Sequence, residues 1–251
     1  MFMKRLNATV LKIIAMISMV LDHTGIRYFH DGRLFRFAGR IAMPLYAFFI
    51  SESVYYTRLH HSEMKHALRL LATAVLAEVP YDLFFSNTIY NPNRNNVIFT
   101  LLIGYLVCVM IHRFANPVAG VLILAAGCWT ALHFSCSYRH IGVLLITAFD
   151  LIAGARRKWP KYNTACDIAM AAAVMTYAGY YIIHNAGSLD RVVPLFFSYN
   201  YSQLGALIAL PLLYCYDGTP GSRHPLLIWI YRLFYPLHLS LLLVMEHLGI
   251  I

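Results

Sequence analysis

The chain has 251 residues, of which 60% are hydrophobic and 12% charged, with a formal net charge of +9. Soluble domains are about 45–50% apolar and about 25% charged, so this composition excludes an ordinary water-soluble globule, and we expect a lipid bilayer to solvate the outside. The apolar runs are long and continuous, which favours membrane-spanning helices over the short alternating strands of a β-barrel. The basic residues lie mainly between these runs without a basic–aromatic stripe, so we expect no nucleic-acid partner.

Nine segments are long and apolar enough to predict an all-α, polytopic bundle, since a spanning helix needs about 20 mostly apolar residues. They are residues 8–29, 34–56, 66–86, 96–114, 117–134, 138–154, 163–184, 201–216 and 226–250. The connections are short, so we expect one domain over residues 1–251. Lys and Arg collect in loops on one side, for example at 156–161, which predicts a cytoplasmic N-terminus and an outer C-terminus.

The first segment carries ionisable residues, which are expensive inside a membrane and usually functional. Lys12 and His23 are eleven residues apart, almost three helical turns, so we expect them on one face about 16 Å apart. Arg27 follows one turn later and Asp22 precedes the histidine. The structural alternative is that Lys12 snorkels to the inner interface while His23 packs against a neighbouring helix. The segment runs on past Asp22 without a small-residue cleavage site, so we expect an uncleaved helix.

The second segment carries Arg36 and Arg40 one turn apart. Two planar guanidinium groups on one face suit an anion. The alternative is that both arginines pair with Asp22 or with Asp82. We expect a bound anion, an ion pair, or both.

Two later segments add polar groups. Glu78 and Asp82 share a face near the predicted outer boundary, where we expect them to neutralise the arginines. Tyr235, His238 and Glu246 share a face of the last segment, with His238 near mid-membrane. The cysteines form no C-x-x-C pair and no H-E-x-x-H motif is present, so we expect no metal.

These residues predict a polar chamber inside an apolar bundle, and three functional classes fit it. A transporter would use the charges to bind and release an anionic solute. A membrane transferase would use a His–Asp pair as a base, with cations holding an anionic donor. A structural membrane subunit would use them for stability alone. Helical periodicity does not choose among these classes.

An ordered set of motifs does discriminate. The motifs are MVLDH at 19–23, FAGRIAMPLYAF at 37–48, NVIFTL at 96–101 and FYPLHL at 234–239. In this order and at these distances they resemble the TraX family, whose named member is a conjugative pilin acetylase of an inner membrane. That family is similar to a larger group of transmembrane acyltransferases that includes the bacterial O-acyltransferases and the lysosomal heparan acetyltransferase.

The resemblance implies roles for particular residues. In the O-acyltransferases the first helix carries a basic residue, then ten residues, then a histidine thought to be catalytic, and Lys12 and His23 match that pattern. Near the sixth segment this chain has Arg-His-Ile-Gly at 139–142 where the family pattern resembles Tyr-Gly-Ile. This departure concerns the outer mouth, and hence the acceptor.

The implied activity is acetyl transfer from cytoplasmic acetyl-CoA to an amine or hydroxyl at the outer face of an inner or plasma membrane. The acceptor would be a peptide or pilin N-terminus or an envelope sugar. His23 would act as general base, Asp22 would orient or balance it, and His238 is a second acid–base candidate. The residues expected to bind the donor or stabilise the oxyanion are Lys12, Arg36 and Arg40.

Overall fold

A computed structural model describes residues 5–29, 32–186, 199–222 and 224–250, and these residues are helical with short connections. The helices are α1 (Ala8–Arg27), α2 (Arg33–Gly39), α3 (Ala42–Leu59), α4 (Glu63–Ser86), α5 (Val97–Phe114), α6 (Pro117–His133), α7 (Arg139–Lys158), α8 (Asn163–Ala186), α10 (Ala209–Tyr214) and α11 (Pro225–His247), with 3-10 helices η1 (Pro160–Tyr162) and η3 (Tyr199–Ile208). Each predicted segment contains helix, and the described residues form isolated β-bridges but no strand. The all-α prediction is therefore confirmed.

Two predicted segments are less regular than expected. The segment 34–56 is broken between α2 and α3 at Arg40 and Ile41. Pro44 lies in the first turn of α3 and has no N–H to donate to the Arg40 carbonyl four residues earlier, which favours a break there. The segment 201–216 starts as the 3-10 helix η3 and only then becomes the short helix α10.

Five helical stretches among the described residues are long and apolar enough to cross a membrane. They are Ala8–Arg27, Arg33–Leu59, Val97–Phe114, Pro160–His184 and Pro225–His247. The chain is thus a multi-pass membrane protein; the orientation of its N-terminus stays a prediction.

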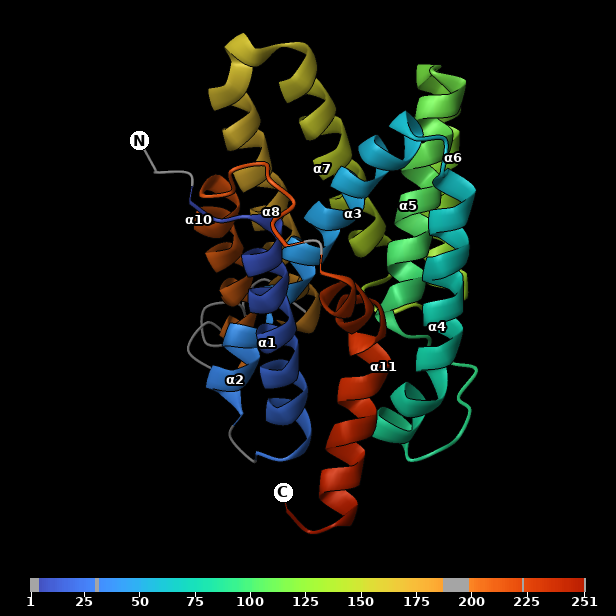
Figure 1. Ribbon diagram of the computed structural model, residues 1–251, viewed down its shortest axis with the longest axis vertical. Helices are drawn as coiled ribbons and strands as arrows, with labels where there is room; N and C mark the ends of the chain where they lie inside the picture. The colour runs from blue at the N-terminus through green and yellow to red at the C-terminus, as the bar shows by residue number, and fades with distance from the viewer. Residues whose placement is uncertain (1–4, 30–31, 187–198, 223, 251) are drawn as a thin grey trace. The chain divides into compact units, whose positions relative to one another are not determined.

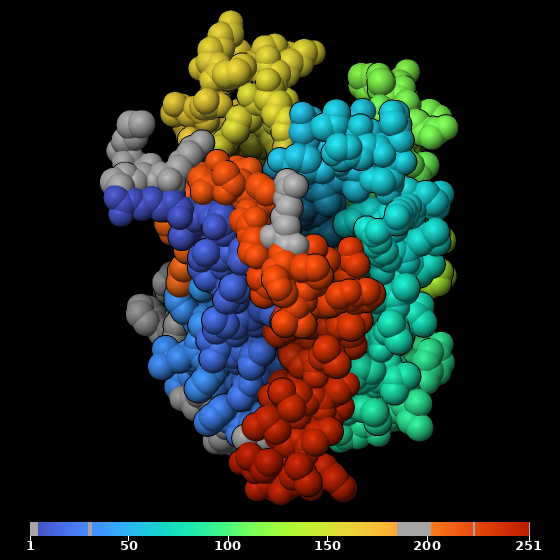
Figure 2. Space-filling model, in the orientation of Figure 1, coloured from blue at the N-terminus to red at the C-terminus, as the bar shows by residue number. Residues whose placement is uncertain are grey.

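Helix α4 has an exposed apolar face. Its exposed apolar residues recur three or four positions apart, at Met64, Leu68, Leu71, Val75 and Val79. This spacing places them on one helical face. Figure 2 shows α4, in teal, as an open strip of surface. A continuous exposed apolar face of this kind suits contact with lipid.

Contacts divide the chain into two units. The first unit comprises residues 1–46 and 162–231, and the second comprises 47–161 and 232–251. Helices α3 and α11 contribute residues to both. The expectation of a single domain stays a prediction.

In the first unit, α1 lies beside α2 (Figure 1). The buried side of α1 is a row of mostly small residues, Ala8, Leu11, Ala15, Ser18, Asp22 and Gly25. Glycines let the backbones approach closely: a Cβ atom added to Gly39 would lie 2.3 Å from Cβ of Asp22. A Cβ atom added to Gly205 of η3 would lie 1.8 Å from the carbonyl oxygen of Phe37 in α2. These close approaches position α2 against the polar end of α1.

In the second unit, α5 packs against α4, α6 and α7 (Figure 1). Asn96 begins α5 by accepting a hydrogen bond from the N–H of Ile98 at 2.9 Å. Val107 of α5 packs with Ala131 of α6 and Val143 of α7 in an apolar core. This core holds the three helices together.

Candidate functional site

A buried ion pair joins α1 to α2 in the first unit. Nη2 of Arg40 donates to Oδ1 of Asp22 at 2.6 Å, and Nε of Arg36 lies 3.9 Å from the same oxygen. Asp22 is 8% exposed and Arg40 is 6% exposed. The predicted pairing of the arginines with Asp22 is therefore confirmed. The lack of a side chain on Gly39 permits it, because α2 approaches Asp22 directly at that residue.

His23 is buried beside this ion pair, with 7% of its surface exposed. Consecutive residues of an α-helix are about 100° apart around its axis. The side chains of Asp22 and His23 therefore leave α1 in different directions, and Asp22 turns to α2. The catalytic roles expected of both residues stay predictions.

Lys12 lies nearer the start of the same helix. Its Nζ atom is 5.3 Å from the centroid of the Tyr231 ring, a cation–π contact that stabilises a charge away from bulk water. Because α1 is an unbroken helix from Ala8 to Arg27, the spacing of eleven residues keeps Lys12 and His23 on one side of it, about 16 Å apart along the axis. The Lys12–His23 row thus runs beside the buried row that contains Asp22.

His238 lies in the second unit, in α11, and is 5% exposed. Its Nδ1 atom donates to the carbonyl oxygen of Phe234 at 2.8 Å, and its ring stacks on the Phe234 ring with centroids 4.7 Å apart. Since a carbonyl oxygen only accepts, Nδ1 carries the proton, and Nε2 of the neutral ring is an acceptor. This tautomer is the one that a general base needs at Nε2.

The two acids of α4 are engaged by asparagines from the chain that follows. Glu78 accepts a hydrogen bond from the side chain of Asn96. Asp82 is fully buried, and its Oδ2 accepts from the N–H of Asn91 at 2.8 Å. These bonds tie the end of α4 to the start of α5. The expected role of these acids in neutralising Arg36 and Arg40 stays a prediction.

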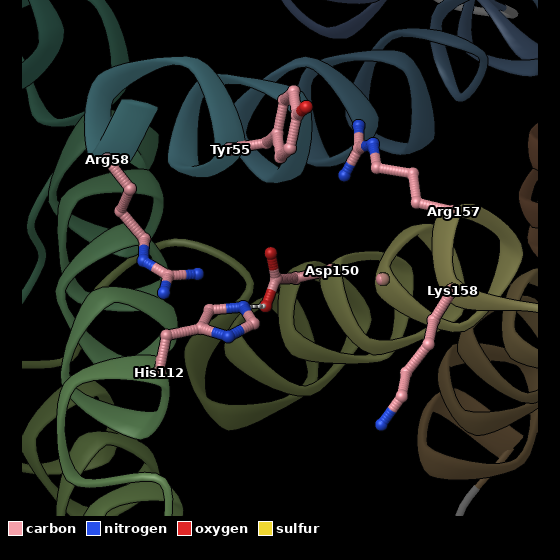
Figure 3. A pocket seen from close by; sticks show the side chains of 7 residues that line it. Tyr55, Arg58, His112, Asp150, Arg157 and Lys158 are labelled. Atoms are coloured by element: carbon pink, nitrogen blue, oxygen red, sulfur yellow. Dashed lines mark hydrogen bonds and ion pairs between the residues drawn. The ribbon is translucent and has the colours of Figure 1, made fainter. Parts of the chain in front are cut away.

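A second polar site in this unit is a pocket of about 300 Å³ where α3, α5 and α7 end. Its lining residues are Tyr55, Arg58, His112, Asp150, Gly154, Arg157 and Lys158. Figure 3 shows Asp150 in the middle of the view, with Arg58 and Arg157 reaching in from different sides. Nε2 of His112 and Oδ2 of Asp150 are 2.7 Å apart, and the Asp150 side chain is almost wholly buried.

The cations of this pocket are held in two ways. Arg157 pairs with Glu52 and lies over the Tyr55 ring, 4.1 Å from its centroid. Arg58 and Lys158 form no ion pair with the part of the chain that the structure describes. All the cations stand in the last turns of their helices, where the helix dipole favours positive charge. Among the residues that line the pocket, three cationic side chains stand against the single carboxylate of Asp150.

Sequence reasoning overlooked His112 and Asp150. Arg157 and Lys158 belong to the basic stretch 156–161, which was used only to predict the orientation in the membrane. The missed signal was Asp150 itself, a carboxylate in the interior of the predicted span 138–154, because such a residue requires a partner. His112, at the end of another span, is that partner.

Comparison with known proteins agrees with the motifs. The sequence model of the family described as "TraX protein" matches residues 7–246. The chain belongs to the TraX family. The match includes every site residue discussed, from Lys12 to His238.

A curated relative of this TraX-family protein is described as "Probable fimbrial assembly protein FimC, serogroup H1" of Dichelobacter nodosus. The two are 29% identical, and the alignment covers 94% of each chain. No solved structure matches the chain.

Proposed function

We propose that this TraX-family protein is a membrane acetyltransferase that moves an acetyl group from cytoplasmic acetyl-CoA to an acceptor at the outer face of an inner membrane. The observation that carries the proposal is buried His23 on the same helical turn as the Asp22–Arg40 pair. A histidine and a charge pair at this position in an apolar bundle supply a base and cations where a membrane protein otherwise avoids them. Membership of the TraX family supports the same chemistry.

The acceptor proposed is the amino terminus of a pilus or fimbrial subunit. The support is the description of the Dichelobacter nodosus relative as a probable fimbrial assembly protein. A hydroxyl of an envelope sugar is the second acceptor chemistry.

In the proposed step the neutral acceptor amine attacks the thioester carbonyl carbon. The new C–N bond forms, the C–S bond breaks, and the departing thiolate becomes free CoA thiol. His23 takes the proton that the amine loses and returns it to the sulfur. Arg36 or Arg40 stabilises the tetrahedral oxyanion, and Asp22 holds Arg40 in place for this.

The test is transfer from labelled acetyl-CoA by the purified protein in nanodiscs. The acceptor is a synthetic peptide with a fimbrial subunit's N-terminus, and the same peptide with a blocked N-terminus is the acceptor control. We expect His23→Ala to lose about 10²-fold or more in rate. His184→Ala, an exposed histidine of the same unit, should keep the wild-type rate.

Full activity in His23→Ala would sink the assignment of this base. The same experiment on His238→Ala decides whether the second histidine takes part. If the protein moves an anionic solute across the bilayer and consumes no acyl donor, the transporter alternative replaces the transferase.

A further inference from the structure

None of the residues assigned above to acetyl transfer lines the pocket at the ends of α3, α5 and α7. We infer that it binds the phosphate groups of the acetyl-CoA donor. This inference rests on the proposed function for the identity of the ligand, but the charge and shape of the pocket stand without it.

The charges of the pocket favour a phosphorylated ligand. Three cationic side chains line it, Arg58, Arg157 and Lys158, against one carboxylate, Asp150. One oxygen of Asp150 is engaged by His112. Arginine presents a fork of donors that matches phosphate oxygens, and lysine adds a point charge.

The walls of the pocket are fixed before a ligand enters. The His112–Asp150 contact ties α5 to α7, and the Arg157–Glu52 pair ties α7 to α3. The Tyr55 ring stabilises the Arg157 guanidinium by a cation–π contact, with 4.1 Å between Cζ and the ring centroid. A preorganised site loses less conformational entropy on binding than a flexible one.

The size of the pocket selects which part of the donor it takes. Its volume of about 300 Å³ lies at the small end of the range for ligand sites, roughly 300–1,000 Å³. It suits the phosphate-bearing end of coenzyme A rather than the whole molecule. The uncharged pantetheine arm would then extend away from the pocket.

The location in the fold agrees with this division. The pocket lies at helix ends that the distribution of basic residues predicts to be on the cytoplasmic side. His112 is sixteen residues after Asn96, so the pocket and the start of α5 are about 24 Å apart along the helix axis. Holding the phosphates at the inner end keeps their charges out of the bilayer while the thin arm carries the thioester inward.

The first experiment measures binding to the purified protein in nanodiscs of neutral lipid. The probes are CoA, 3′-dephospho-CoA and pantetheine. We expect CoA to bind most tightly and pantetheine most weakly. Arg58→Gln and Lys158→Gln should each weaken CoA binding about tenfold or more, because a charge-assisted hydrogen bond is lost. The matched control is Arg113→Gln. Arg113 is a basic residue in the last turn of α5, next to His112, and does not line the pocket.

The second experiment compares acetyl-CoA with acetyl-pantetheine, a donor without phosphates, in the transfer assay. Wild type should prefer acetyl-CoA, and Arg58→Gln should reduce that preference, the ratio of the two kcat/KM values, about tenfold. An unchanged ratio overturns the inference. If wild type transfers acetyl from neither donor, the proposed function fails, and the binding experiment still decides whether the pocket takes phosphates.

An anionic lipid headgroup offers the same phosphate chemistry, so nanodiscs containing phosphatidylglycerol form the third arm. CoA binding that is unchanged by phosphatidylglycerol supports the inference. If wild type and every variant lose CoA binding in the anionic bilayer, the pocket binds the lipid headgroup, and the inference is overturned. Equal affinity of wild type and Arg58→Gln for CoA also overturns it, provided that both unfold at the same temperature.

Discussion

The buried ion pair between Asp22 and Arg40 makes a quantitative prediction about folding. Asp22→Asn removes the carboxylate to which Nη2 of Arg40 donates and near which Nε of Arg36 lies, so the buried Asp22 charge that both arginines share is lost. Arg40→Gln leaves the Asp22 carboxylate buried, but Arg36 is already 3.9 Å from it. The two single substitutions are therefore not equivalent: the loss of the shared anion should cost more than the loss of either cation.

The magnitude follows from the burial of both groups. Removing one partner of a buried pair costs about 3–5 kcal/mol. At about 2–4 °C per kcal/mol for a chain of this size class, the unfolding midpoint of Asp22→Asn should fall by roughly 6–20 °C. The unfolding midpoint of Arg40→Gln should fall less than that of Asp22→Asn. The double variant removes both charges at once, so its loss should be smaller than the sum of the two single losses.

The assay is thermal unfolding of the purified protein in one detergent, without donor or acceptor, followed by tryptophan fluorescence. Wild type, the two single variants and the double variant complete a double-mutant cycle. Single losses that add to within about 0.5 kcal/mol would refute the coupling of the two groups. A larger loss in Arg40→Gln than in Asp22→Asn would refute the role given to Arg36.

Two further predictions concern packing and orientation. Gly39→Ala should destabilise the protein by about 1–3 kcal/mol, because its Cβ would collide with Asp22. The control Gly179→Ala, whose Cβ would meet nothing within 4 Å, should be neutral or stabilising. Equal unfolding temperatures of the two variants would show that α2 does not approach α1 so closely. In a cysteine-free background, an impermeant thiol reagent should label Asn93→Cys in intact cells and Lys161→Cys only after permeabilisation; the reverse pattern would place the N-terminus outside.

Much of the fold can be predicted from the sequence, because a long apolar run alone specifies a membrane helix. All nine runs contain helix. The break between α2 and α3 is harder to predict from the sequence, since Pro44 is compatible either with a kink inside a helix or with the first turn of a new helix. The 3-10 geometry of η3 cannot be predicted from hydropathy, because an apolar run of this kind is equally compatible with an α-helix. In the structure η3 packs against α2 and α8.

The pairing of charges was predictable only where the partners are close in sequence or share an obvious pattern. Asp22 and Arg40 lie on helices joined by a short connection, so proximity was a reasonable expectation. His112 and Asp150 are 38 positions apart on helices separated by α6. Contacts between membrane helices depend on fine packing rather than on a hydrophobic pattern, so no periodicity marks this pair. The one available clue was Asp150, because a carboxylate inside a membrane span requires an ionisable or hydrogen-bonding partner.

The distribution of polar groups along α5 bears on the choice between transferase and transporter. The pocket with His112 stands at its end and the Glu78–Asn96 contact stands at its start. Between these, the buried side chains of α5 from Leu101 to Cys108 are apolar apart from the Tyr105 hydroxyl, which bonds to Thr57. A transporter needs its charges along a path that opens to each side in turn, because an ionic solute must stay solvated as it crosses. Along α5 the ionisable side chains, His112 and Arg113, instead stand in the last turn. That arrangement suits a donor whose charged end remains at one surface while only its uncharged arm enters the apolar layer.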